Sequence, residues 1–329
     1  MMTTLKDIRA MSLEDANKLN FEVLEAIEDN NLSRLKEILK KYPAHIFCYE
    51  PIFKNEKYPL FEPLNLILGA AYTCEANDND FAILDYLFDE YGLSLKDPKY
   101  NVSHSNMKHI KELNDRYILI KEIEDKKLAS NALIYAYLLE SQKPKSKIVR
   151  YLVARGARFE IYNHKGEGWI DETPLHEWAR GSSPHLLKVA IKGGANVDMQ
   201  RLGTRGNGTQ YNDTLLTNSV RQLVWRMPSG RDDVRVTKLL IKLGANVNWA
   251  TPYTPLDEAQ GARTKKILKD AGAMTSAQIC EKFNLPQYDD SHCRINGKVD
   301  GKLLNKYLDE RARLINEALQ KAREMGKIS

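Results

Sequence analysis

The stretch that most constrains how this chain can fold is residues 173–198, which read TPLHEWARGSSPHLLKVAIKGGANVD. Thr173 can cap a helix by accepting a hydrogen bond from a backbone N–H, and Pro174 suits the first helical position, where no N–H is needed. Gly194 can end a second helix, because glycine adopts the left-handed conformation at little cost. The stretch therefore predicts two short helices with a stop on each side.

The same order of signals recurs along the chain. Starts of the TPL type lie at positions 173, 214 and 254, and weaker starts lie at Glu62 and Asn131. Two apolar segments separated by Asp29-Asn30-Asn31 precede them all. The paired apolar runs end at Gly92 or at Gly-Ala, which stands at 156–157, 194–195, 244–245 and 272–273. One such helix pair cannot bury its apolar face alone, so the pattern predicts that successive pairs stack.

Residues 173–198 resemble one ankyrin repeat. The match is carried by Thr173, Pro174, Leu175, His176, Ala179, Leu186, Leu187, Ile191, Gly194, Ala195, Val197 and Asp198. It departs at Trp178, where the family usually has alanine. The resemblance covers about residues 17–275, strongly in three repeats and by inference in three more. It implies an all-α ankyrin-repeat solenoid of about six divergent repeats with helical N- and C-terminal caps.

The domain organisation follows from this resemblance. We expect the array and its N-terminal cap within residues 1–275, with Ser12 and Asp15 at capping-box spacing starting a helix over 12–20. An insertion at about 96–130 has the pattern of a charged amphipathic helix. Residues 276–329 then form a C-terminal helical cap or tail.

Two connections are unusual. Residues 199–213, MQRLGTRGNGTQYND, are rich in glycine and arginine and predict a projecting hairpin or loop. Residues 274–296 show no period and are expected to be irregular. Residues 300–325 then predict a final helix with one apolar stripe, formed by Leu304, Leu308, Ile315, Leu319 and Ala322.

The composition narrows the classes of function. Net charge is +5, but 49 basic and 44 acidic residues make a mixed surface, so we expect no nucleic-acid binding. The longest apolar run, around residues 64–72, falls far short of the roughly 20 residues of a membrane span. Four cysteines without a CxxC motif favour a reduced, cytoplasmic location, and the polar N-terminus argues against a secretory signal.

Several residues invite a catalytic or metal-binding interpretation. His176 has the residue type of a general base, but the ankyrin resemblance implies that it hydrogen-bonds backbone between neighbouring loops. Cys280, His292 and Cys293 fit no zinc signature, and the glycines of 203–208 do not follow a strand of a βαβ unit as a phosphate loop does. We therefore expect no cofactor, no metal and no enzymatic activity. The alternative is an enzyme whose active site is concealed in the non-repeat segments.

The resemblance implies a protein-protein interaction module, such as a scaffold, adaptor or inhibitor. In ankyrin arrays the fingers and first helices line a concave face that binds partner proteins, and aromatic and arginine side chains dominate such interfaces. The corresponding positions here are Tyr162, Trp169, Glu177, Arg180, Arg201, Arg205, Tyr211, Asn218, Arg221, Trp249, Tyr253 and Glu258. We expect a monomer whose partner is another protein.

Ankyrin arrays also occur in effectors that intracellular bacteria deliver into host cells. That class of protein is favoured by the divergent, insertion-rich repeats of this chain and by its basic C-terminal tail at 308–327, in which glutamates are interspersed. Under this hypothesis the protein acts in the host cell cytosol.

Overall fold

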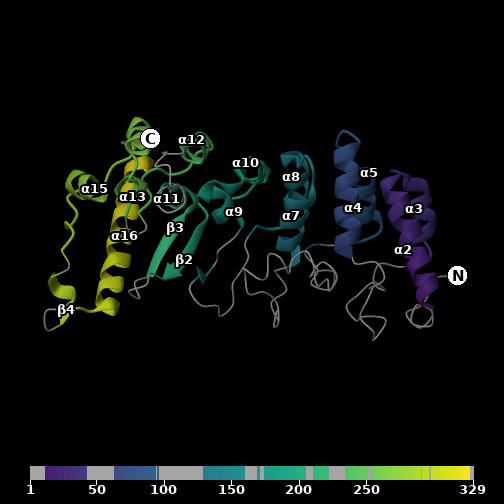
Figure 1. Ribbon diagram of the computed structural model, residues 1–329, viewed down its shortest axis with the longest axis horizontal. Coiled ribbons are helices and arrows are strands. Elements are labelled where there is room, and N and C mark those ends of the chain that lie inside the picture. Colours follow the sequence, from purple (N-terminus) through teal and green to yellow (C-terminus); the bar gives the residue numbers. More distant parts are fainter. Residues whose placement is uncertain are drawn as a thin grey trace. The chain divides into compact units, whose positions relative to one another are not determined.

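The computed structural model describes residues 12–42, 63–93, 95, 129–159, 169–170, 174–204, 210–221, 234–250, 253–289, 291–295 and 298–326 (Figure 1). The chain divides into two compact units. The first comprises residues 1–161 with 192–195, and the second comprises 162–191 with 196–329. The described residues are mostly helical, as the sequence predicts, and two small antiparallel sheets accompany the helices in the second unit.

The described residues of the first unit form three successive helix pairs. They are α2 (Leu13–Glu28) with α3 (Leu32–Leu39), α4 (Pro63–Ala76) with α5 (Ala82–Asp85) and its π-helical continuation η2 (Tyr86–Glu90), and α7 (Ala129–Glu140) with α8 (Ser146–Ala154). The first helices pack in chain order, α2 against α4 and α4 against α7. Leucine, isoleucine and alanine side chains fill the interior between them.

Polar contacts join neighbouring pairs of the first unit. Lys36 on α3 pairs with Glu90 on η2 at 2.7 Å, and Arg155, just after α8, pairs with Asp85 and Asp89. Tyr137 on α7 donates its hydroxyl to Glu75 on α4 at 2.8 Å. Exposed ion pairs contribute little to stability, so apolar packing of the first helices carries most of the stabilisation.

The helix that we expected over residues 12–20 is not a separate cap. Ser12 does begin a helix, because its hydroxyl accepts the Asp15 N–H at 3.1 Å. That helix, α2, continues without a break to Glu28, so its first residues belong to the first helix pair. The insertion expected at 96–130 lies outside the described residues up to 128, and residues 129–130 begin α7.

The second unit contains the remaining helix pairs, a hairpin and a C-terminal segment. In chain order these are β1 (Trp169–Ile170), α9 (Pro174–Glu177), η4 (Trp178–Ser182), α10 (Pro184–Gly193, of which 192–193 are counted in the first unit), β2 (Gln200–Thr204), β3 (Gln210–Thr214), α11 (Leu215–Arg221), α12 (Arg235–Lys242), α13 (Pro255–Glu258) and α14 (Ala262–Asp270). Helix α11 packs against both η4 and α13, so the first helices again contact one another in chain order.

The connection at 199–213 is a β-hairpin, one of the two forms that the sequence predicts. Strand β2 pairs with β3, with Arg201 opposite Asp213 and Gly203 opposite Tyr211, and β1 adds a third strand at Trp169. This sheet is a departure from a purely helical chain. A connection of this length must satisfy its backbone N–H and C=O groups, and pairing its two halves does so.

The C-terminal segment corrects one expectation and confirms another. Residues 274–296 are not wholly irregular: Thr275 and Gln278 form a capping box that begins α15 (Ser276–Lys282). After the turn η6 (Ser291–Cys293), strands β4 (Arg294–Ile295) and β5 (Lys298–Val299) pair with each other. Helix α16 (Gly301–Glu324) is the predicted final helix, with Asp300 as its N-cap.

The C-terminal segment packs onto the end of the last helix pairs. Its core joins Ile279 and Cys280 on α15 to Ile315 and Leu319 on α16, and Ala250 completes it. Asn316 of α16 also hydrogen-bonds both backbone groups of Ala250, at 3.0 and 3.1 Å. The segment therefore covers apolar surface in the way that a capping element does.

Glycine ends the second helix of five pairs in the left-handed conformation, as the sequence predicts. The five are Gly92, Gly156, Gly194, Gly244 and Gly272, with φ between 83° and 121°. An L-residue is strained at such φ values, by about 1–2 kcal/mol.

We expect Gly272→Ala to lower the free energy of unfolding by about 1–2 kcal/mol, because its φ is +83°. The same chemical change at Gly69, inside α4, is expected to raise it by about 0.5–1 kcal/mol. A methyl group there meets only Ile27 Cγ2, at an ordinary 3.7 Å. Urea denaturation followed by circular dichroism measures both, and equal effects of the two substitutions would contradict the assignment of Gly272 as a helix stop.

Candidate interaction site

One hydrogen bond recurs between the segments that follow successive helix pairs, which we call junctions. Asp198 Oδ1 accepts the backbone N–H of Asn246 at 2.8 Å. One pair later, Asn248 Oδ1 accepts the backbone N–H of Met274 at 2.6 Å. Asp198 and Asn248 hold the same place relative to their helix-ending glycines, and so do Asn246 and Met274. The same bond therefore links each of these junctions to the next.

A buried charge network lies beside the hairpin. Asp213 on β3 is fully buried, and Arg221 on α11 donates to both of its carboxylate oxygens at 2.6 Å. Arg201 on β2 is 3.5 Å from the same carboxylate, and Arg221 also bonds Glu258 on α13 at 3.0 Å. We call Arg201, Asp213, Asn218, Arg221 and Glu258 the Asp213 network. Its two arginines balance its two carboxylates.

The electrostatics of the network reflect its burial. Burial raises the pKa of Asp213 above its ordinary value, and the neighbouring Arg221 and Arg201 oppose that shift. Burial disfavours the charge of Arg221, but Asp213 and Glu258 together raise its pKa above the ordinary value. A buried charge that loses its partner is costly, so the network fixes the relative positions of β2, β3, α11 and α13.

His176 lies in the interior next to this network. The imidazole is fully buried, and backbone groups of Met199 and Asp213 hydrogen-bond to it. Its own carbonyl accepts Asn218 Nδ2 at 2.7 Å. Burial, followed by the positive charge of Arg201, holds the pKa of His176 well below its ordinary value. These contacts agree with the structural role implied by the family resemblance, since an enclosed neutral imidazole joins neighbouring backbone segments.

Two residues that we expected to face a partner are buried instead. Arg201 is 2% exposed and Asn218 is 1% exposed. Arg201 Nη2 donates to Asn218 Oδ1 at 3.0 Å, and the same guanidinium offsets the charge of Asp213. The prediction that Arg201 projects from the finger and that Asn218 lines a binding face is therefore wrong. Both side chains make their contacts in the interior, because Arg201 lies beside the buried Asp213 carboxylate and Asn218 accepts a hydrogen bond from Arg201.

The other predicted partner-binding residues divide into three groups. Arg221 and Glu258 come together as an ion pair and keep some exposure, while Arg180, Trp249 and Tyr253 are half-buried. The backbones of Trp169, Glu177 and Tyr211 are described, but their side chains are not. Tyr162 and Arg205 lie outside the described residues. The structure thus brings together the Arg221–Glu258 pair and leaves the wider face as a prediction.

Sequence reasoning overlooked Asp213, on which the network depends. The signal was present: an acidic residue stands directly before the helix start at Thr214, and five arginines lie within residues 201–231. Trp178, the departure from the family pattern, is buried and begins the π-helical turn η4. The π-helical turn η4 thus begins at the bulky Trp178 side chain.

Comparison with known proteins finds no matching family model and no matching curated protein. In the described part of the chain, no group of three or more histidine, cysteine or acidic side chains is placed to hold a metal ion. No helix among the described residues is long and apolar enough to cross a membrane.

Arg221→Met tests the Asp213 network. The substitution leaves a fully buried carboxylate with one arginine at 3.5 Å, so we expect the free energy of unfolding to fall by about 2–3 kcal/mol. Arg313→Met is the matched control, because Arg313 also pairs with two carboxylates, but on the exposed surface of α16. Urea denaturation of both variants is the measurement. A loss for Arg313→Met as large as that for Arg221→Met would show that burial of the network is not what matters.

Proposed function

We propose that the protein is a non-catalytic interaction module: an ankyrin-like array of about six helix pairs that binds a partner protein. The observation that carries the proposal is the repeated junction bond, Asp198 to Asn246 and then Asn248 to Met274. A bond that recurs at equivalent positions is what a stacked repeat produces, because each pair meets the next in the same way.

The burial of several polar side chains supports this proposal. His176, Asp213, Arg201 and Asn218 are buried and bonded to one another or to backbone. Of these four, His176 invites a catalytic interpretation, and all four make contacts that stabilise the fold. Under this proposal a partner protein binds the surface of the array.

We place the centre of the partner-binding surface on the connection from α12 to α13. Trp249 and Tyr253 stand on this connection, and both are half-buried, so each ring presents some of its surface to solvent. Glu258 follows on α13, held by Arg221. Aromatic side chains bury a large area at low entropic cost and lie at the centre of many protein interfaces.

The test is a double substitution, Trp249→Ala with Tyr253→Ala, that leaves Arg221 intact to support Asp213. We expect the double variant to keep its helical circular dichroism and to bind the captured partner at least about tenfold more weakly, as expected for interface aromatics. The partner is first captured from a cell lysate with the wild-type chain, and affinity is then measured with the purified pair.

Phe21→Ala is the matched control, because Phe21 is an exposed aromatic residue, 66% accessible, on α2 of the first unit. We expect it to leave the affinity unchanged. If the double variant binds as well as wild type, or if Phe21→Ala weakens binding equally, the proposed surface is misplaced.

A further inference from the structure

Arg311 on α16 is a buried cation whose hydrogen-bonding capacity is largely unused. It is 5% exposed, and its Nε and Nη1 atoms have no hydrogen-bond acceptor among the described residues. Its Nη2 atom is 3.8 Å from Cys280 Sγ, a weak acceptor, and its guanidinium carbon is 5.7 Å from the ring centre of Tyr288. Burying a guanidinium without an anion is costly, so its position calls for an explanation.

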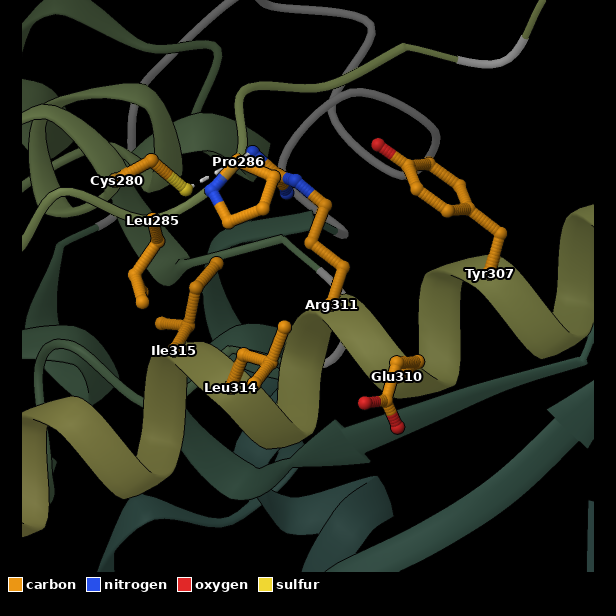
Figure 2. Close-up of a pocket in the computed structure, with 8 residues that line it drawn as sticks. All are labelled: Cys280, Leu285, Pro286, Tyr307, Glu310, Arg311, Leu314 and Ile315. Carbon is orange, nitrogen blue, oxygen red and sulfur yellow. Dashed lines mark hydrogen bonds between the residues drawn. The ribbon is translucent and has the colours of Figure 1, made fainter. Parts of the chain in front are cut away.

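Arg311 lines a pocket of about 200 Å³ between α15, α16 and the segment that joins them. The other walls are mainly apolar and come from Cys280, Leu285, Pro286, Tyr307, Leu314 and Ile315. Figure 2 shows the Arg311 side chain extending from α16 toward Cys280 and Pro286, with Tyr307 on its other side. We call this the Arg311 pocket. It combines an apolar body with one cationic group.

The nearest carboxylate on the pocket wall does not neutralise Arg311. Glu310 also lines the pocket, but Arg313 holds both of its carboxylate oxygens, at 2.5 and 2.9 Å. That bond with Arg313 holds the pKa of Glu310 below its ordinary value. In Figure 2 the Glu310 carboxylate points away from the Arg311 guanidinium. Among the described residues, Arg311 therefore has no carboxylate partner, and its cation can pair with an anion from solution.

We propose that the Arg311 pocket binds a carboxylate carried on a short apolar body. The carboxylate supplies the acceptor that Nε and Nη1 lack, in a charge-assisted hydrogen bond, and the body displaces water from the leucine, isoleucine and proline walls. An apolar cavity of about 150 Å³ holds a benzene molecule, so this pocket has room for a body of that size or slightly larger. A free medium-chain carboxylate and the C-terminal apolar residue of a polypeptide share this chemistry.

The experiment compares ligands that differ only in charge. Isothermal titration calorimetry of the full chain is carried out with octanoate and with its neutral amide, octanamide. A peptide ending in a free leucine carboxylate and the same peptide amidated form the second arm. A charge-assisted bond in a desolvated site is expected to make the acid bind about ten- to a hundredfold more tightly than its amide. The arm in which this preference appears identifies the source of the carboxylate.

Two variants test whether Arg311 causes the preference for the acid over its amide. Arg311→Met is expected to remove the preference and to melt at or above the wild-type temperature, because an apolar side chain replaces an unpaired buried charge. Lys321→Met, at an exposed position further along the same helix that does not line the pocket, is expected to retain the preference. Equal binding of acids and amides by the wild-type chain, or a preference that survives Arg311→Met, overturns the proposal.

A second measurement needs no variant. Cys280 lines the pocket, so a bound carboxylate should slow its reaction with N-ethylmaleimide at least about tenfold, followed by mass spectrometry of the Cys280 peptide. Cys74, buried in the first unit, is the internal control whose rate should not change. If neither octanoate nor the acidic peptide protects Cys280 at concentrations that saturate the calorimetric signal, the bound carboxylate is not in this pocket and the proposal fails.

Discussion

The hydrogen bond from one junction to the next is the interaction on which the second unit depends. A helix pair of this size has an apolar face that it cannot bury by itself, so it is stable only against a neighbour. Asp198 and Asn248 fix the separation between neighbours, because each accepts a backbone N–H from the following junction in a partly buried hydrogen bond. Apolar packing supplies the stabilisation, and these two side chains set its register.

The Asp213 network adds a second constraint on the same helix pairs. The fully buried Asp213 carboxylate pairs with Arg201 on β2 and with Arg221 on α11. Arg221 also pairs with Glu258 on α13. Two residues that looked suited to binding are thereby used inside the fold. Under our proposal, the partner protein contacts side chains outside the Asp213 network, and Trp249 and Tyr253 lie at the centre of this contact. The proposed Arg311 pocket is separate from these residues along the chain, and among the residues that the structure describes its cation has no carboxylate partner.

The starts and ends of many helices were predicted correctly from the sequence. Proline near helix starts, Ser12 as a cap, and glycines at helix stops all act through the backbone of their own segment, so they can be identified without knowledge of the fold. The apolar stripe of the final helix was also correct for Leu308, Ile315, Leu319 and Ala322, which are buried.

The charged residues of the interior were not predictable in this way. Arg201 looks like a solvent-exposed finger residue, and Arg311 like part of the polar face of α16, yet both are buried. Their burial depends on where Asp213 and the Cys280 segment lie in space, which no local pattern records. The capping box of α15 was missed for a different reason: Thr275 and Gln278 were visible, but the absence of a long period hid the short helix.

The stacking of successive pairs through their junctions is tested most directly by amide hydrogen exchange, measured residue by residue by NMR. We predict slow exchange at Asn246 and Met274, with Asp198→Ala accelerating Asn246 at least about tenfold and sparing Met274. Asn248→Ala should accelerate Met274 instead. Fast exchange at both amides in the wild-type chain, or rates that neither substitution changes, would contradict the stacked array.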